Sequence, residues 1–169
     1  MAKSTFSGPV KSLAGFISAG VNNSVSLTAD TTLTVDAHAG KILLCNDADG
    51  KFTLPSISST TPSDPTDPNQ ANNIGASFFF YIETLASDLD IKTDGTDKFK
   101  GAVITAIDDS TKKAFVPAAS NDVMTLNGTT KGGIVGSVVQ VTAIDAATYL
   151  VHNSLLIGSG TIVTPFADA

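Results

Sequence analysis

Short apolar runs separated by turn residues recur along most of this chain, and their spacing limits the possible folds more than any other feature. Residues 25–27, 52–54 and 89–91 alternate apolar and polar side chains with the two-residue period of a β-strand. Glycine, proline, asparagine or aspartate separates many of these runs. About ten short strands joined by such turns predict an all-β domain, either a β-sandwich or a barrel-like fold.

Two of the apolar runs also carry predictions about burial. The run at 42–45 is apolar throughout, which predicts a strand buried on both faces. The run at 77–85 is the most hydrophobic and is expected at the centre of a sheet. Asn127-Gly128 and the D-A-A-T stretch at 145–148 are predicted to connect paired strands. Further strands are predicted at 33–35, 103–107, 114–116, 121–126, 138–144, 149–152, 155–157 and 161–163, with turns at 93–96 and 108–111.

The choice of charged residues excludes several classes of function. Glu83 is the only glutamate among 16 acidic residues, all 10 basic residues are lysines, and the formal net charge is −6. Aspartate favours turns and glutamate favours helices, so this composition agrees with strands and turns. Because the chain lacks arginine and is net negative, neither nucleic-acid binding nor binding to an anionic membrane is expected.

The proportion of charged residues is low for a chain of this size. Only 15% of the 169 residues are charged, whereas 42% are hydrophobic. This balance predicts one domain with a core, and a surface that is neutral-polar or buried against partners. The sequence has no apolar run of transmembrane length, and Gly8, Pro9 and Lys11 interrupt its beginning. Neither a membrane span nor a signal peptide is therefore expected.

The chain divides into an N-terminal arm at 1–22 and a β-domain at 23–169. Gly15 and Gly20 disfavour a stable isolated helix in the arm, and the sequence leaves open whether the arm packs on its own domain or on a neighbour. Residues 56–76 contain three prolines and are predicted to form a long irregular loop, which resembles an insertion. The chain ends in a short tail in which Phe166 is expected to be exposed.

The stretch N-D-A-D-G at 46–50 suggests a calcium loop, because two carboxylates precede a glycine. If Gly50 held the sixth position of an EF-hand loop, Cys45 would hold the first and Ser56 the twelfth. The first oxygen ligand and the bidentate carboxylate would both be missing. A hairpin connection fits better, and no metal or cofactor is predicted.

Candidate nucleophiles and bases are few. Neither His38 nor His152 lies in a motif that places a base beside a nucleophile. Cys45 follows three apolar residues, which predicts a buried, unreactive thiol.

Paired carboxylates give no stronger indication of catalysis. Asp88/Asp90 and Asp108/Asp109 qualify by number only, since the first pair lies on an alternating strand and the second in a predicted turn. Asp64 and Asp67 lack an evident third ligand for a cation. The chain is therefore predicted not to be an enzyme, and no catalytic residue is assigned.

Four stretches of the sequence are similar to one known family. They are K-S-T-F-S-G-P-V-K-S-L-A-G-F at 3–16, N-D-A-D-G-K-F-T-L-P at 46–55, D-V-M-T-L-N-G-T-T-K-G-G-I-V-G-S-V-V-Q-V at 122–141 and G-S-G-T-I-V-T-P-F at 158–166. Together they resemble the head decoration, or capsid-stabilising, proteins of tailed bacteriophages. The resemblance covers most of the chain except 56–76. It implies a protein made in the host cytoplasm that binds major capsid subunits on the outer surface of the virion, often as a homotrimer.

The apolar residues of the arm and the tail are the predicted contacts with the capsid or with a neighbouring subunit. They are Phe6, Pro9, Val10, Leu13, Phe16, Ile17 and Phe166. Two alternatives stay open: a head-fibre or tail component, and a secreted carbohydrate-binding or adhesin module with the 56–76 loop at its site.

Overall fold

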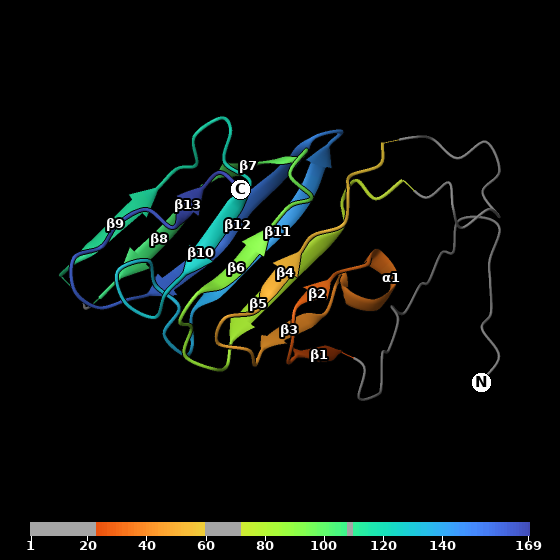
Figure 1. The fold of residues 1–169 in the computed structure, drawn as a ribbon. Coiled ribbons are helices and arrows are strands. Elements are labelled where there is room, and N and C mark those ends of the chain that lie inside the picture. The colour runs from red at the N-terminus through yellow and green to blue at the C-terminus, as the bar shows by residue number, and fades with distance from the viewer. Residues whose placement is uncertain (1–22, 60–71, 108–109) are drawn as a thin grey trace, which may run out of the picture.

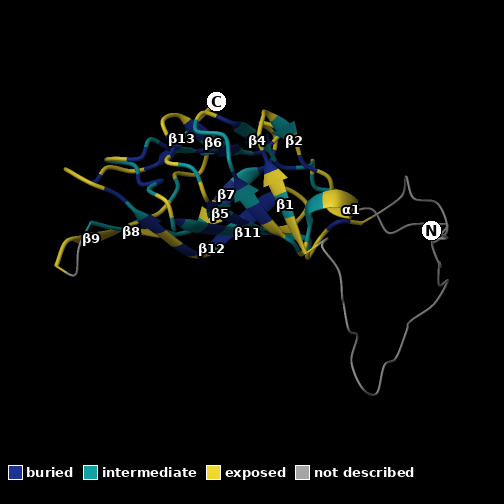
Figure 2. Cartoon of the chain, turned by 90° about the horizontal axis from the view of Figure 1, so that it is seen from below, coloured by how far each residue is buried: buried dark blue, intermediate teal, exposed yellow. Residues whose placement is uncertain are grey.

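The computed structural model describes residues 23–59, 72–107 and 110–169 of the chain. Two β-sheets pack face to face, as Figure 2 shows nearly edge-on, and this confirms the predicted all-β fold in its sandwich form. The arm, most of the 56–76 loop and residues 108–109 lie outside the described residues.

The larger sheet has eight strands and forms one layer of the sandwich (Figure 1). Its order is β1 (Ser24–Leu27), β3 (Ile42–Cys45), β5 (Ser77–Ile82), β11 (Val138–Asp145), β12 (Thr148–Ile157), β8 (Val103–Ala106) and β9 (Lys112–Phe115), with β7 (Lys98–Gly101) paired to the first half of β12. The predicted pairing across D-A-A-T is confirmed, because β11 and β12 are antiparallel neighbours. The predicted central position of the 77–85 run is also confirmed, because β5 lies between β3 and β11.

The smaller sheet has five strands and covers part of the larger one. Its order is β13 (Phe166–Ala167), β10 (Val123–Leu126), β6 (Leu89–Lys92), β4 (Lys51–Thr53) and β2 (Thr31–Thr32). One short helix, α1 (Val35–His38), follows β2.

The core lies between the two sheets and is formed by the inward side chains of alternating strands. Phe78, Phe80 and Ile82 of β5 are fully buried, and the ring of Phe80 stacks on Phe52 of β4 with centroids 6.4 Å apart. This contact joins the two sheets across the core. Burying one such side chain contributes about 1.5–3 kcal/mol, so these rings hold the layers together.

Two predicted strands are wrong because local hydrogen bonds favour other conformations. The run at 33–35 leads into α1 instead: Thr34 caps the helix and its hydroxyl accepts a hydrogen bond from the Ala37 amide at 3.3 Å. The run at 161–163 has no ladder partner in the described structure, although the Val163 amide bonds to the Thr130 carbonyl. The strand β7 was not predicted.

The strand at 42–45 is correct, but its predicted burial is wrong on one face. Leu43 and Cys45 are fully buried, whereas Ile42 is 45% exposed and Leu44 is half-buried. Among the described residues, only the inner side of this sheet is covered, so the apolar run does not mark a strand that they bury on both faces.

The N-D-A-D-G stretch is not the tip of a hairpin. It crosses from β3 in the larger sheet to β4 in the smaller sheet, and these two strands do not pair. The Ala48 carbonyl accepts bonds from the amides of Ser87 and Asp88, at 2.7 and 3.2 Å. Cys45 and Phe52, on the flanking strands, enter the same core from opposite layers. A connection that crosses between the sheets allows both side chains to be buried there, whereas a hairpin would keep both strands in one sheet.

The hairpin predicted at Asn127-Gly128 is also wrong. β10 and the next strand, β11, lie in different sheets, and the turn closes locally because the amides of Asn127 and Gly128 both bond to the Gly132 carbonyl. The Asn-Gly dipeptide therefore correctly predicts a turn at this position, but it does not show that the strands on either side pair with each other.

Phe166 is buried, which corrects its predicted exposure. Only 6% of the residue is exposed, its ring lies 6.3 Å from that of Phe99, and its strand β13 pairs with β10. The tail thus forms one edge of the smaller sheet. A buried aromatic ring on this chain's own core has no free surface for a capsid.

Candidate interaction face

The outward face of the larger sheet carries a continuous row of apolar side chains, and we call this surface the outer face. Six neighbouring strands each contribute one residue at matching register. The row is Leu44, Tyr81, Val138, Leu155, Ile104 and Ala114. Leu155 and Ile104 are 46% and 49% exposed, and none of these side chains belongs to the buried core.

A second row runs beside the first and becomes polar toward the middle of the sheet. Ile42 of β3 is aligned with Phe79 of β5, which is aligned with Gln140 of β11 and then His152 of β12. Neither row contains Lys, Asp or Glu. An apolar strip with a few polar side chains beside it has the composition of a protein-binding surface.

A β-bulge in β12 turns Leu155 outward. Asn153 has a positive φ of 46°, and the register between β11 and β12 shifts between Val138 and Gln140. Without the extra residue, Ser154 would follow His152 on the outer face. Because of the bulge, Ser154 is buried with its hydroxyl bonded to the His152 carbonyl at 2.7 Å, and Leu155 is exposed.

Strand β8 shows the same inversion without a bulge. Ile104 points outward, whereas Thr105 is fully buried and its hydroxyl has no hydrogen-bond partner in the described structure. Folding alone would favour the opposite order, because a buried hydroxyl without a partner costs about 1–3 kcal/mol. The outward apolar residue on β8 is therefore not explained by the stability of this domain.

The polar part of the outer face is a hydrogen-bond network. Gln140 donates to the Ser77 hydroxyl at 2.9 Å, Thr142 Oγ1 donates to the same oxygen at 3.0 Å, and Asn153 donates to Gln140 Oε1 at 3.0 Å. His152 Nε2 lies 2.8 Å from Thr142 Oγ1. The described structure places no carboxylate on the His152 ring, so the network orients side chains and lacks the third member of a catalytic triad.

The outward face of the smaller sheet differs in character. Lys51 lies 3.1 Å from Asp88 and 3.0 Å from Asp90, and the Thr125 hydroxyl donates to Asp90 at 2.7 Å. Burial alone would lower the pKa of Lys51, but the hydrogen bonds to Asp90 and Asp88 outweigh it and raise that pKa. The predicted carboxylate pair Asp88/Asp90 therefore serves an ion pair on a solvated surface.

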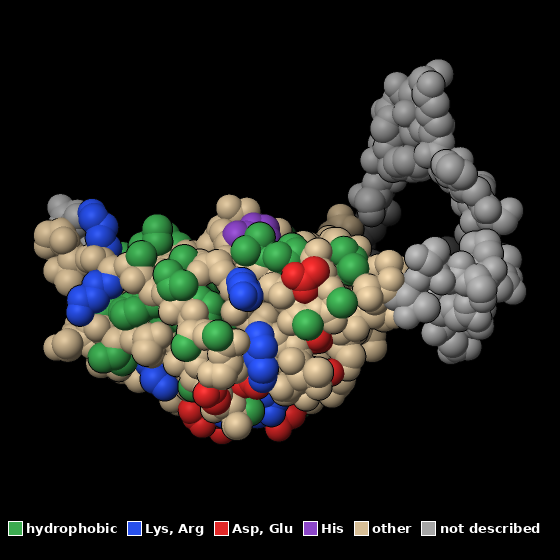
Figure 3. All heavy atoms as spheres, turned by 90° about the horizontal axis from the view of Figure 1, so that it is seen from above, with side chains coloured by type: hydrophobic (Ala, Val, Ile, Leu, Met, Phe, Trp, Pro, Cys, Tyr) green, Lys and Arg blue, Asp and Glu red, His purple; other side chains and the backbone are tan. Residues whose placement is uncertain are grey.

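Figure 3 shows this difference on one side of the molecule. Most hydrophobic side chains lie toward the upper part of the view, around a histidine and with lysine and acidic side chains among them, while most acidic side chains lie along the lower part. The two surfaces are thus chemically distinct.

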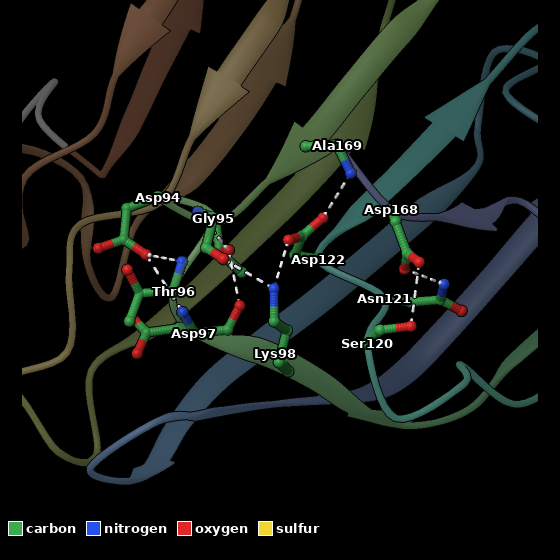
Figure 4. Close-up of polar contacts among 11 residues, drawn as sticks. Asp94, Gly95, Thr96, Asp97, Lys98, Ser120, Asn121, Asp122, Asp168 and Ala169 are labelled. Carbon is green, nitrogen blue, oxygen red and sulfur yellow. Dashed lines mark hydrogen bonds and ion pairs between the residues drawn. The ribbon is translucent and has the colours of Figure 1, made fainter.

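A separate group of aspartates lies near the C-terminus, and Figure 4 shows hydrogen bonds to the carboxylates of Asp94, Asp122 and Asp168. Asp94 accepts the amides of Thr96 and Asp97, at 2.9 and 3.2 Å. Asp168 accepts from Ser120 and Asn121, at 3.0 and 2.7 Å. These bonds close a turn and hold the tail, so the group serves the fold.

Asp122 is the most constrained member of this group. Its side chain is 7% exposed, pairs with Lys98 at 2.5 Å and accepts the Ala169 amide at 2.9 Å. Burial acts to raise the pKa of Asp122, but the bond to Lys98 and the Ala169 amide outweigh it and lower that pKa. Asp97 is different, because burial raises its pKa.

The remaining candidates from the sequence do not form a site. The thiol of Cys45 is buried, and this burial raises its pKa to about 12, which leaves it protonated and unreactive. His38 accepts the Thr34 amide through Nδ1 at 2.9 Å at the start of its own helix. Asp47 and Asp49 belong to no group of three potential metal ligands in the described ranges.

The other residues considered in the sequence lie outside the described ranges. Asp64, Asp67, Asp108 and Asp109 lie outside the described residues, as do the predicted contact residues of the arm. Those arm residues are Phe6, Pro9, Val10, Leu13, Phe16 and Ile17. Within the described ranges, no helix has the length and hydropathy needed to span a bilayer.

No family model, curated protein or solved structure matches this chain. The resemblance to phage decoration proteins therefore stays a prediction.

Proposed function

We propose that this chain is a structural virion protein that decorates and stabilises the outer surface of a phage capsid. The outer face supports this proposal most strongly, because an uncharged apolar row crosses six strands on a sheet face that nothing in the described structure covers. Strands lie about 4.8 Å apart, so the row extends for about 24 Å. A stable protein interface buries roughly 800 Å² on each partner, which corresponds to a patch of similar width.

The chemistry of the outer face suits a large protein surface as its partner. Its apolar row would be buried on binding, while Gln140, His152 and Asn153 offer hydrogen bonds that fix the orientation. The inversions at Thr105 and Ser154 support selection of the outward residues for binding. Major capsid subunits are the partner that we propose, with homotrimer formation and the outer-surface location carried over from the resemblance.

Two other functions compete with this proposal. A head-fibre or tail component would use the same face on another virion protein. A secreted carbohydrate-binding or adhesin module would instead use the 56–76 loop, and glycan-array binding that is lost on deletion of residues 60–71 would favour it. The proposal involves no catalytic step and no cofactor.

Binding to particles that lack this protein tests the proposal. Particles are prepared from the phage genome that encodes the chain, with its gene deleted, and purified protein is added back and co-sedimented. Ile104→Glu and Leu155→Glu are expected to weaken attachment by at least about tenfold, because each places a charge in the centre of the interface.

Thr53→Glu is the matched control. It introduces the same side chain at a half-buried outward position of the smaller sheet, opposite Lys92. Its attachment is expected to stay within about twofold of the original chain. Equal loss for all three variants, or no attachment of the original chain, would rule out the outer face as the capsid-binding surface.

A further inference from the structure

The outer face raises a question that is independent of any capsid. In the free protein, an apolar row of this extent would stand in water or promote association of copies. Ile104 and Leu155 of the row, Ile42 of the second row and Ile144 farther along β11 are among the exposed large hydrophobic residues of the described chain. The chain itself contains one segment with the composition to cover the row.

We propose that residues 1–22 dock on the outer face of their own chain in the free protein. The sequence of this segment contains seven large apolar residues, and it contains none of the chain's 16 Asp and Glu residues. Its only charged side chains are Lys3 and Lys11, which suit a net negative protein. Two phenylalanines, four branched aliphatic residues and one methionine match the apolar row in kind.

The place where the segment joins the sheet favours this docking. The described chain begins at Asn23, whose carbonyl accepts the Ile42 amide at 3.0 Å, and Ser24 is aligned with Ile42 in the parallel β1–β3 pair. The segment therefore starts at the edge of the sheet, beside the second row of the outer face. No other described strand lies beyond β1 on that side.

The length of the segment is sufficient for the whole face. An extended chain spans about 3.4 Å per residue, so 22 residues reach up to about 75 Å. Phe16 is seven residues from Asn23 and reaches up to about 24 Å, whereas β12 lies four strand spacings, or about 19 Å, from β1. A tether of this length gives an effective concentration in the millimolar range, which favours the same chain over a second copy at dilute concentration.

Tryptophan fluorescence tests the docking directly in the full chain, because the sequence has no tryptophan. Phe16→Trp supplies the only one. We expect its emission maximum in the folded protein to lie well to the blue of that in urea, and its quenching by acrylamide to be reduced at least about threefold.

Substitutions on the face then show where the segment binds. In the Phe16→Trp background, Phe79→Glu and Leu155→Glu are expected to shift the emission to that of a solvated tryptophan, whereas Thr53→Glu on the smaller sheet leaves it blue-shifted. Far-ultraviolet circular dichroism confirms that each variant is folded. If one face variant fails to fold, the other still reports whether the segment leaves the face. Leu13→Asp in the arm gives a second test. In the otherwise original chain it should undock the segment and so raise the binding of a hydrophobic dye.

Three results would overturn the inference. Emission that matches the urea-unfolded chain would show that the segment is not docked. Blue-shifted emission that survives both face substitutions would place the segment elsewhere, and a blue shift that disappears on dilution would assign the segment to a neighbouring copy. The assay contains no capsid, so its outcome and that of the particle-binding experiment are independent.

Discussion

The two outward faces of this sandwich are built from strands of the same kind but differ in chemistry. On the smaller sheet, Lys51, Asp90 and Thr125 are aligned and bonded to one another, as expected for a face in water. On the larger sheet, one apolar residue from each of six strands, from Leu44 of β3 across to Ala114 of β9, lies in a row at matching register. The same core stabilises both sheets, so the difference is not a requirement of the fold.

The difference lies where the outward side chains depart from what stability alone would favour. A stable sandwich needs apolar residues on the inner sides only, with polar residues outside. The larger sheet departs from this rule all along the apolar row. At two positions, Ile104/Thr105 and Ser154/Leu155, the departure also places a hydroxyl inward.

The largest expected effect separates the outer face from the core. Leu156→Ala should lower the free energy of unfolding by about 3 kcal/mol, because Leu156 is fully buried. Leu155→Ala should change it by less than about 1 kcal/mol, because nearly half of Leu155 is already exposed. Urea unfolding of the two variants measures this. Similar losses for both would mean that Leu155 belongs to the core and that the outer face is poorly defined.

The next effect tests whether the aspartates near the C-terminus serve folding rather than binding. Asp122→Asn should lower the free energy of unfolding by about 2 kcal/mol, because it leaves Lys98 without its ion pair and weakens the bond to the Ala169 amide. Attachment to particles per folded molecule should not change. Asp168→Asn, at an exposed position, is the control and should cost less.

The lowered pKa of Asp122 predicts how the stability difference between the original chain and Asp122→Asn depends on pH. The stabilisation from Asp122 is complete above the unfolded-state pKa of about 3.9 and is lost as the pH falls through that value toward the lower folded-state pKa. Asp97, with a raised pKa, acts in the opposite direction. The stability difference between the original chain and Asp122→Asn should therefore shrink below about pH 4, and a constant difference down to pH 2.5 would contradict this assignment.

A smaller effect of opposite sign is expected at the inverted pair of β8. Thr105→Val should raise the free energy of unfolding by about 1 kcal/mol, because it removes a buried hydroxyl without a partner and keeps the side-chain shape. Thermal unfolding measures the gain. A loss of stability would indicate that the hydroxyl has a partner, and the inversion would then no longer support a role for Ile104.

The smallest effect belongs to the polar face. Lys51→Ala should cost no more than about 0.5 kcal/mol, since the partly exposed ion pairs of Lys51 are weakened by solvent and salt. Particle attachment should be unaffected. If this variant no longer attached to particles, the binding surface would lie on the smaller sheet, and the proposal for the outer face would be wrong.

Calcium provides a test in which no effect is expected. Asp49→Ala should leave the melting temperature unchanged with or without calcium, because the N-D-A-D-G stretch is a connection between sheets held by the Ala48 carbonyl. Calcium-dependent melting that disappears in this variant would restore the metal-site hypothesis.

Local patterns predicted much of the fold, and the pairing of distant strands explains the rest. The hydrophobic run at 77–85 and the alternation at 89–92 identified β5 and β6, since both signals depend only on neighbouring residues. The N-D-A-D-G and Asn127-Gly128 signals were read as hairpins because a turn signal does not reveal which sheet the next strand joins. Phe166 was expected to be exposed because the partner that buries it, Phe99, is 67 residues away in the sequence.

The outer face could not be predicted from the sequence for the same reason. Its row joins residues from 44 to 114 and from 138 to 155, and their alignment depends on strand order and on a bulge at Asn153. The one available signal was the apolar run at 42–45. Ile42 and Leu44 in this run are apolar although they lie on the outward face of the sheet. That signal was interpreted as two-sided burial.

The orientation of the protein on its particle tests the central claim most directly. A cryo-electron microscopy map of the decorated phage head, at a resolution that separates the two sheets, shows which one faces the shell. We predict that β5, β11, β12 and β8 lie against the capsid and that the smaller sheet, with Lys51 and Asp90, faces solvent. A map in which the smaller sheet contacts the shell and the apolar row is exposed, or in which the protein is absent from the head, would contradict the account.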